Sequence, residues 1–233
     1  MNPKQLYSQL YKKFGPQLWW PVTDAGEVKP TYKKRSKLTE KQKLEICIGA
    51  ILTQNTNWGN VMRAIENLQK ANSVGIDAIA DAKQHKLAEL IKPSGYYNKK
   101  AIKLQEFCKY LQQNYNSNLE QFLGKPTAEL RAELLSLYGI GNETADNMLC
   151  YAAERPVFVV DAYTIQLMER IFGKTDLNYV EAQAFFQSQL PKSSKVLNEM
   201  HALIVEFAKQ HCRKKPLCGK CFLKSSCKRP PNK

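Results

Sequence analysis

The sequence predicts an all-α protein, and three observations support this fold class. Apolar residues recur at helical spacing through most of the chain, strand-like patterns are almost absent, and no segment repeats at a fixed period. Only Val157-Phe158-Val159-Val160 is β-like, and this run is too short to form a sheet without partners. With 43% hydrophobic and 24% charged residues the chain can bury a sizeable core, which excludes disordered and collagen-like classes.

The predicted helices follow one another with short connections. The first covers 3–14, and an irregular stretch over 15–37 follows, because Pro16, Pro21, Gly26 and Pro30 interrupt the periodicity. Thr39 is a suitable N-cap for a helix over 41–52, which is apolar nearly all round and should be central and buried. Further helices are expected over 58–71, 74–82, 85–91, 99–114, 118–123, 127–137, 162–172, 180–190 and 195–211.

The net charge of +14 is the first indication of a partner. A surface this basic attracts polyanions, either nucleic acid or an anionic membrane, although a solvated basic face kept for solubility is the simpler alternative. No apolar run approaches the length of a membrane span, and the N-terminus lacks a signal pattern. We therefore expect a soluble cytoplasmic protein, monomeric and without a membrane partner.

Four cysteines form a group near the C-terminus with the spacing C-x5-C-x2-C-x5-C: Cys212, Cys218, Cys221 and Cys227. Cytosolic proteins seldom keep structural disulfides, so the group indicates a metal site, either tetrahedral zinc or an iron-sulfur cluster. Zinc sites commonly present two short pairs, and the single short pair here favours a cluster. Cys47, Cys108 and Cys150 lie among apolar neighbours and are expected to be buried.

The segment 134–149 reads as a helix, a tight hairpin Gly139-Ile140-Gly141 and a second helix. The glycines permit positive φ and close approach of another chain, and the amides that open the second helix can bind a phosphate oxygen. An ordinary glycine turn between two helices is the alternative.

Asp161 follows the apolar run 157–160 and precedes a predicted helix. It can serve simply as the N-cap of that helix. Alternatively, a carboxylate kept ionised by the helix N-terminus is suited to orient water or to stabilise a developing cation.

Taken together, the Gly139–Gly141 hairpin, Asp161 and the cysteine group resemble the helix-hairpin-helix DNA glycosylases of the endonuclease III superfamily, over almost the whole chain. The segments 18–21, 49–56, 93–98 and 149–151 are similar to its 3-methyladenine DNA glycosylase branch. The resemblance implies two helical domains with double-stranded DNA bound in the cleft between them. One is a central helical barrel over 38–153, and the other joins 1–37 to 154–233.

The resemblance also assigns roles to residues. Gly139, Ile140 and Gly141 would grip the DNA backbone, Asp161 would be the catalytic carboxylate, and Gln54 would enter the gap left by the flipped nucleotide. The base pocket would contain Trp19, Trp20, Pro21 and Trp58, and the four cysteines would hold a [4Fe-4S] cluster, with zinc as the alternative. Cys212 and Cys218 enclose five residues, one fewer than in endonuclease III.

Glu143 departs from the pattern of the bifunctional members, which carry at this position a lysine that forms a Schiff base with the sugar. A carboxylate cannot form that imine, so the sequence predicts a monofunctional enzyme that uses water and leaves the strand intact. Glu143 itself could act in the pocket as a second catalytic residue, or it could be a first-turn acid that suits the helix dipole.

The sequence therefore predicts a glycosylase of base excision repair that removes alkylated bases, chiefly 3-methyladenine. A cationic base is a good leaving group and is attracted by tryptophan faces. The alternatives are a monofunctional glycosylase acting on mismatched uracil, thymine or adenine, and a binder of damaged DNA without catalysis. His201 and His211 are expected to be structural.

Overall fold

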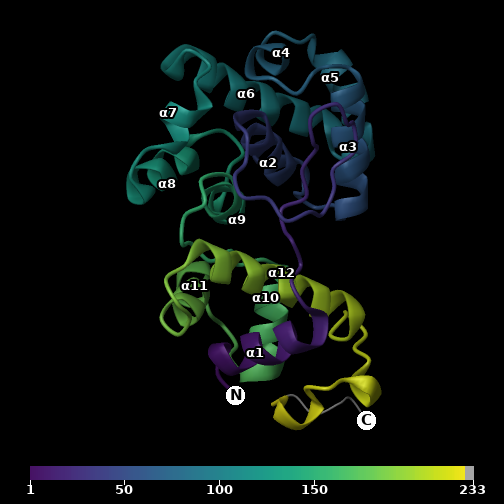
Figure 1. The fold of residues 1–233 in the computed structure, drawn as a ribbon, viewed down its shortest axis with the longest axis vertical. Helices are drawn as coiled ribbons and strands as arrows, with labels where there is room; N and C mark the ends of the chain where they lie inside the picture. Colours follow the sequence, from purple (N-terminus) through teal and green to yellow (C-terminus); the bar gives the residue numbers. More distant parts are fainter. Residues whose placement is uncertain (229–233) are drawn as a thin grey trace. The chain divides into compact units, whose positions relative to one another are not determined.

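The computed structural model describes residues 1–228, and the described chain contains twelve α-helices (Figure 1). An irregular stretch over 15–39 connects α1 to α2, and the other connections are shorter. Within these residues the β pairing is a single isolated bridge between Val22 and Thr31. The all-helical prediction is confirmed. The chain divides into two compact units, one formed by 1–19 and 156–233 and the other by 20–155.

The unit 20–155 contains eight helices, and α2 is the central one (Figure 1). They are α2 (Glu40–Leu52), α3 (Trp58–Lys70), α4 (Ile76–Ala80), α5 (Gln84–Leu90), α6 (Tyr97–Tyr115), α7 (Leu119–Leu123), α8 (Thr127–Ser136) and α9 (Asn142–Asn147), which continues into a π-helix over Met148–Ala152. Thr39 caps α2 in a capping box with Gln42, and every residue from Leu44 to Leu52 is buried. The prediction of a central helix at this place is confirmed.

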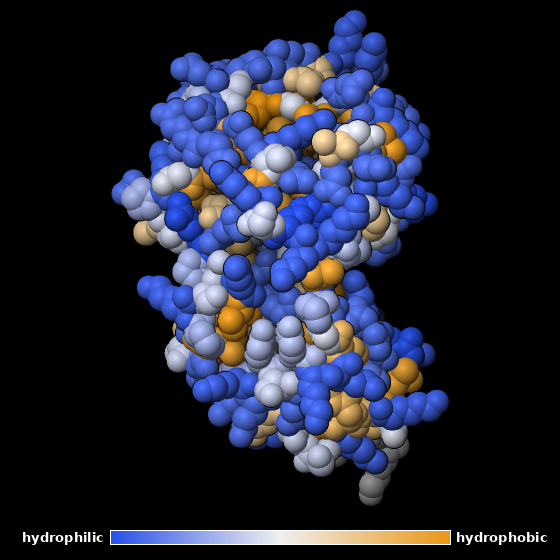
Figure 2. Space-filling view, in the orientation of Figure 1, coloured by the Kyte–Doolittle hydropathy of each residue, from blue (hydrophilic) through white to orange (hydrophobic). Residues whose placement is uncertain are grey.

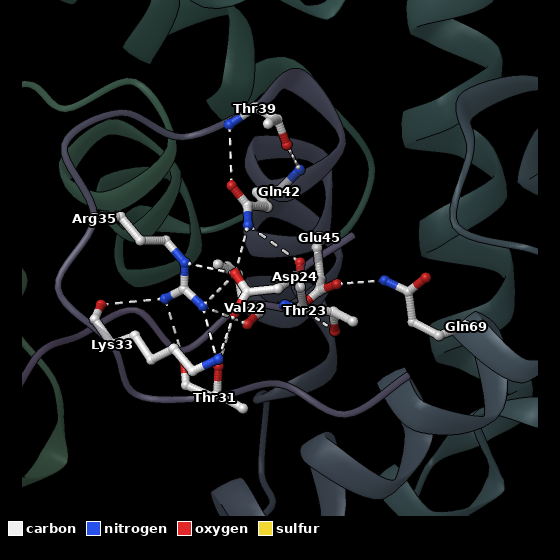
Figure 3. A network of polar contacts seen from close by, with 10 residues as sticks. All are labelled: Val22, Thr23, Asp24, Thr31, Lys33, Arg35, Thr39, Gln42, Glu45 and Gln69. Carbon is white, nitrogen blue, oxygen red and sulfur yellow. Dashed lines mark hydrogen bonds and ion pairs between the residues drawn. The ribbon is translucent and has the colours of Figure 1, made fainter. Parts of the chain in front are cut away.

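The segment 20–37 lies in this unit, whereas the sequence prediction grouped it with the chain ends. Figure 3 shows the contacts that hold it there. Thr23 donates its backbone N–H (2.8 Å) and its hydroxyl (3.1 Å) to the buried carboxylate of Glu45 on α2. Gln42 donates to the Thr23 carbonyl at 3.1 Å. These buried partners are distant in sequence, so periodicity could not identify them.

The other unit contains α1 (Pro3–Phe14), α10 (Ala162–Leu167), α11 (Tyr179–Gln187) and α12 (Ser194–Gln210). A π-helix over Met168–Phe172 extends α10. The core of this unit joins Leu6 and Leu10 of α1 to the apolar faces of α10, α11 and α12. The first and the last of the predicted helices thus contribute to one core, although nearly two hundred residues separate them.

The β-like run 157–160 is buried but is not a strand. Side chains of α11 satisfy its backbone: Gln187 accepts from the Phe158 N–H at 2.8 Å, and Gln183 donates to the Phe158 carbonyl at 2.7 Å. Phe158 also stacks on Phe186 with ring centroids 4.4 Å apart. The run is β-like in composition because it is buried, and side chains replace the missing neighbouring strand.

The visible surface of both units is predominantly hydrophilic, with small apolar patches (Figure 2). Among residues 1–228, no helix has the length and apolar character needed to cross a membrane.

Candidate active site

Asp161 is the N-cap of α10, and its largely buried carboxylate has two separate sets of contacts. Oδ1 accepts from the backbone N–H of Thr164 at 2.7 Å and from its hydroxyl at 2.8 Å. Oδ2 lies 3.6 Å from Nε2 of His201, at ion-pair distance. Burial acts to raise the pKa of Asp161, but His201 and the Thr164 donors outweigh burial and hold that pKa below its ordinary value. Capping and an ionised carboxylate, weighed as alternatives from sequence, are therefore compatible.

Trp19 belongs to the same unit as Asp161 and packs on α12. Its ring meets the His201 imidazole edge-on, with centroids 5.9 Å apart, and Lys209 places its ammonium 5.8 Å from the ring centroid. The Trp19 carbonyl accepts from Asn198 at 3.3 Å. His201, which we expected to be merely structural, thus contacts two of the residues assigned to the site from sequence.

Trp20 and Trp58 come together in the unit 20–155. Their rings are perpendicular with centroids 4.9 Å apart, and Tyr151 packs against Trp20 at 5.1 Å. Trp20 is only 6% exposed, whereas Trp58 is partly exposed. Gly49 on α2 makes room for the Trp20 indole, since a Cβ there would lie 3.1 Å from Cζ2 of Trp20. Trp58 is therefore the more exposed of the two tryptophans, and Trp20 packs against it as its buried support.

Pro21, the fourth residue of the predicted base pocket, is buried beside Trp20 in the chain. Its neighbour Val22 forms the bridge to Thr31 and accepts from Arg35 at 3.1 Å. Lys33 and Arg35 pair with Asp24 and lower the pKa of that carboxyl to about 2. This polar network, together with the Glu45 contacts, fixes the backbone that follows Trp20 (Figure 3).

The hairpin and Gln54 form a second polar cluster of the unit 20–155. Gln54 donates to the carbonyl of Gly139 at 3.0 Å and to the hydroxyl of Thr144 at 2.9 Å, and it accepts from Lys103 at 2.5 Å. Gly139 has φ +75, and a Cβ there would overlap the Lys103 stem at 2.5 Å. The glycine is thus required both by its backbone conformation and by the close approach of Lys103. Ile140, between the two glycines of the hairpin, is buried, and Gly141 is the N-cap of α9.

Glu143 lies in the exposed first turn of α9, two residues after Gly141. A buried lysine lies elsewhere in the same unit: Lys100 donates to the carbonyls of Leu52 and Ser94 at 2.7 Å each. Burial, aided by Lys103, lowers the pKa of Lys100 to about 8. Because both acceptors are backbone carbonyls, Lys100 caps the end of α2 and fixes the loop that carries Gln54.

The four C-terminal cysteines lie in a loop of two 3-10 turns, Cys218–Lys220 and Lys224–Ser226. Cys212 is buried, and Arg170 donates to its carbonyl at 3.1 Å and to its sulfur at 3.4 Å. Burial raises the pKa of Cys212 and Cys221, and neighbouring cysteines of the group raise both values further. The sulfurs are thus near enough to influence one another.

The donor chemistry of this group suits a metal site. Within the described residues none of the seven cysteines forms a disulfide, and Cys47, Cys108 and Cys150 are buried as predicted. No set of three or more His, Cys, Asp or Glu side chains in 1–228 is arranged so as to hold a metal ion. The four cysteines fit a cluster by residue type and by their place in and beside one loop.

Sequence reasoning missed several residues that hold the site together. His201 had a signal, since it interrupts the apolar face of the last long helix. Tyr151 and Arg170 had none, because their contacts depend on the packing of π-helical turns that periodicity does not reveal. Glu45 resembled a surface residue, and only the structure places it in the interior.

Residues 48–192 match the family described as HhH-GPD superfamily base excision DNA repair protein. A chain of Methanocaldococcus jannaschii whose name assigns it to the DNA repair glycosylases is 40% identical over 225 residues, which are 96% of this chain and 94% of that one.

Two solved structures share the fold. The H. pylori 3-methyladenine DNA glycosylase (MagIII) bound to 1,N6-ethenoadenine has a TM-score of 0.72 and 28% identity, over 90% of this chain and 98% of that one. A trapped endonuclease III–DNA covalent intermediate has a TM-score of 0.74 and 21% identity over 98% and 96% of the two chains, which supports the fold alone. The chain belongs to the HhH-GPD superfamily of base excision DNA repair proteins, and it is a DNA glycosylase of that family.

Proposed function

We propose that this glycosylase removes alkylated purines, chiefly 3-methyladenine, from double-stranded DNA by hydrolysis, with Asp161 as the catalytic carboxylate. The observation that carries the proposal is the aromatic group of Trp20, Trp58 and Tyr151, in which Trp58 is partly exposed. A flipped base is held by stacking, and a cationic base gains about 0.5–2 kcal/mol from a ring face. The 28% identity to the H. pylori 3-methyladenine enzyme supports the same substrate class.

The chemistry follows from the charge of the substrate. The electrons of the glycosidic bond pass to the cationic base, which leaves as neutral 3-methyladenine, and the sugar becomes an oxocarbenium ion. The ionised carboxylate of Asp161 stabilises that cation and orients water, whose oxygen bonds to C1′ while its proton is released. Because the base carries its positive charge before the bond breaks, no acid is needed to protonate it.

Release of the base without strand cleavage is part of the proposal. Glu143 stands where the lyase members carry lysine, and the buried amine of Lys100 is engaged by two carbonyls. Gln54 and the hairpin are proposed to hold the DNA around the extruded nucleotide, through contacts with the backbone and the vacated stack.

The direct test is base release from methylated double-stranded DNA, with the released bases separated and identified. We expect 3-methyladenine to dominate and the abasic strand to remain uncut on a denaturing gel. Borohydride should trap no covalent protein–DNA adduct. Release of mismatched uracil or thymine, with no release of a methylated base, would contradict the proposed substrate. A trapped adduct would contradict the hydrolytic mechanism but not the substrate.

We further propose that Cys212, Cys218, Cys221 and Cys227 hold a [4Fe-4S] cluster, which would fold the basic loop and take no part in bond cleavage. Their thiol donors and shared loop support this proposal. Anaerobically purified protein should be brown, with about four iron atoms and four sulfides per chain. A colourless protein with one zinc atom per chain would contradict the cluster and indicate a zinc site.

A further inference from the structure

Helix α12 contacts both Asp161 and the segment that carries Trp19, all within one unit. His201 is the residue that contacts both: its Nε2 lies 3.6 Å from Oδ2 of Asp161, and its ring meets Trp19 edge-on at 5.9 Å. The His201 side chain is only 5% exposed, so its place is fixed by packing. A histidine between an ionised carboxylate and an aromatic ring can influence the orientation and the charge of the carboxylate at once.

The Trp19 segment is anchored to α12 at two further points. Glu199 accepts from the backbone N–H of Gln17 at 2.6 Å, and Asn198 donates to the Trp19 carbonyl at 3.3 Å. The side chains of Asn198, Glu199 and His201 are consecutive or nearly so on α12, so one turn of this helix holds both the segment and the carboxylate. Rotation or displacement of that turn would move Asp161 and Trp19 together.

The two oxygens of Asp161 have unequal surroundings. Oδ1 accepts from the backbone N–H and the hydroxyl of Thr164, and through this contact Asp161 caps α10, as an N-cap aspartate does in any protein. Oδ2 is the oxygen left for chemistry, and His201 is what faces it. The other charged groups near this arrangement act at a distance: Lys209 faces Trp19, and Glu199 is engaged by Gln17.

We propose that His201 is a positioning residue for the hydrolysis: it directs Oδ2 of Asp161 and fixes the carboxylate relative to Trp19. The inference rests on the proposed function, because it requires Asp161 to be the catalytic carboxylate. A buried histidine that only fills space would contribute to folding but not to the state of Asp161. The two roles differ in what substitution does to the pH dependence of the rate.

The test compares His201→Phe, which keeps the ring contact with Trp19 and removes the donor, with His201→Gln, which keeps a donor and removes the imidazole ring. His85→Gln, on the exposed surface of α5, is the matched control. Single-turnover release of 3-methyladenine is measured across pH for each protein, beside thermal unfolding. Misplacing a catalytic group costs about 10- to 100-fold, so we expect a loss in this range for His201→Phe and a smaller loss for His201→Gln.

The pH profile is the decisive readout. His201 lowers the pKa of Asp161, so without it that pKa rises, and the acid limb of the rate profile should move to higher pH. His201→Phe with wild-type rate and an unmoved acid limb would overturn the proposal. If His201→Phe fails to fold, His201→Gln decides by the same two measurements. Asp161→Asn, measured alongside, distinguishes failure of the proposed function from failure of the inference about His201. If Asp161→Asn stays active, the proposed function fails. If Asp161→Asn is inactive while both His201 variants behave as wild type, only the inference about His201 fails.

Discussion

The two units hold their candidate functional residues by different means. Asp161, in the unit of the chain ends, is held by hydrogen bonds from Thr164 and faces the His201 imidazole at 3.6 Å. Trp20 and Trp58, in the unit 20–155, are held by ring packing and by the space that Gly49 leaves. In the proposed function, charge governs the carboxylate that reacts, and shape governs the surface that receives the base. The contrast teaches that substitutions in the first unit should alter rate and pH dependence, and those in the second should alter stability and selectivity.

The largest effect is expected from Asp161→Asn, which retains an oxygen for capping but loses the charge. Base release should fall about 10²- to 10⁴-fold, while DNA affinity and thermal stability stay near wild type. Asp161→Ala should be equally inactive and also less stable by about 1 kcal/mol, because α10 loses its cap. Single-turnover assays and denaturant titrations measure the two effects. Equal stability of both variants would show that the cap is unimportant.

Glu45→Ala tests the interior of the other unit. It leaves the buried donors of Thr23 and Gln69 without their acceptor, which should lower the free energy of unfolding by about 3 kcal/mol. Glu66→Ala, which removes only a surface pair with Lys70, should change it by less than about 1 kcal/mol. Urea titration of the two variants provides the comparison, and similar losses would mean that the Glu45 contacts carry little of the stability.

The Glu45 carboxyl also predicts that the free energy of unfolding depends on pH. Burial raises the pKa of Glu45 in the folded state, so the native protein binds its proton more tightly than the unfolded chain does. The associated stability is present at low pH and is lost as pH rises through the folded pKa. Glu45→Gln should remove this part of the slope, measured as the free energy of unfolding against pH. An unchanged slope would show that groups other than Glu45 cause the pH dependence.

Gly49→Ala should disturb the aromatic group by adding volume beside Trp20. The added Cβ would press on the Trp20 indole at 3.1 Å, and overpacking of this kind costs about 1–3 kcal/mol of stability. Because Trp20 supports Trp58, base release should weaken as well, with the rate profile unmoved along the pH axis. A shifted acid limb would break the division between charge and shape.

Selectivity should respond to the tryptophans by a smaller factor. Trp58→Leu keeps apolar area but removes the ring face, so cationic 3-methyladenine should lose about two- to thirty-fold more rate than a neutral lesion. Trp20→Leu, at the buried ring, should lower both rates alike, because it removes packing. Trp19→Leu is the corresponding variant in the other unit. Parallel losses for both lesions in Trp58→Leu would indicate packing there too.

The smallest effect concerns the basic C-terminal loop. Replacing the exposed Lys214 and Lys215 by Gln should reduce the salt dependence of DNA affinity, by about 0.9 in the slope of log K against log salt for each phosphate that is no longer neutralised. Base preference should not change, since phosphate contacts do not specify sequence. Lys12→Gln with Lys13→Gln on α1 removes the same charge. Equal reductions would show that overall charge matters more than the loop. Arg229, part of the same basic stretch in the sequence, lies outside the described residues.

Sequence patterns predicted the elements well, because the helices have strong apolar periodicity and clear caps. Thr39, Asp161 and the Gly139 hairpin are local signals that the structure places where they were expected. The sequence prediction grouped the segment after Trp20 with the chain ends, because its partner Glu45 is a buried charge that composition cannot distinguish from a surface one. The importance of His201 depends on contacts between α12, α10 and Trp19, which no single helix encodes.

The unit boundary has a consequence for synthesis of the chain. Residues 20–155 are contiguous, so everything that this unit needs has been translated before the second half of the other unit exists. Leu6 and Leu10 of α1, in contrast, require partners as distant as Phe207, and their apolar face must wait for the last helix to leave the ribosome. We expect the unit 20–155 to fold during translation, and the unit of the chain ends only after α12 has been synthesised. The first helix would be the part of a nascent chain most in need of a chaperone.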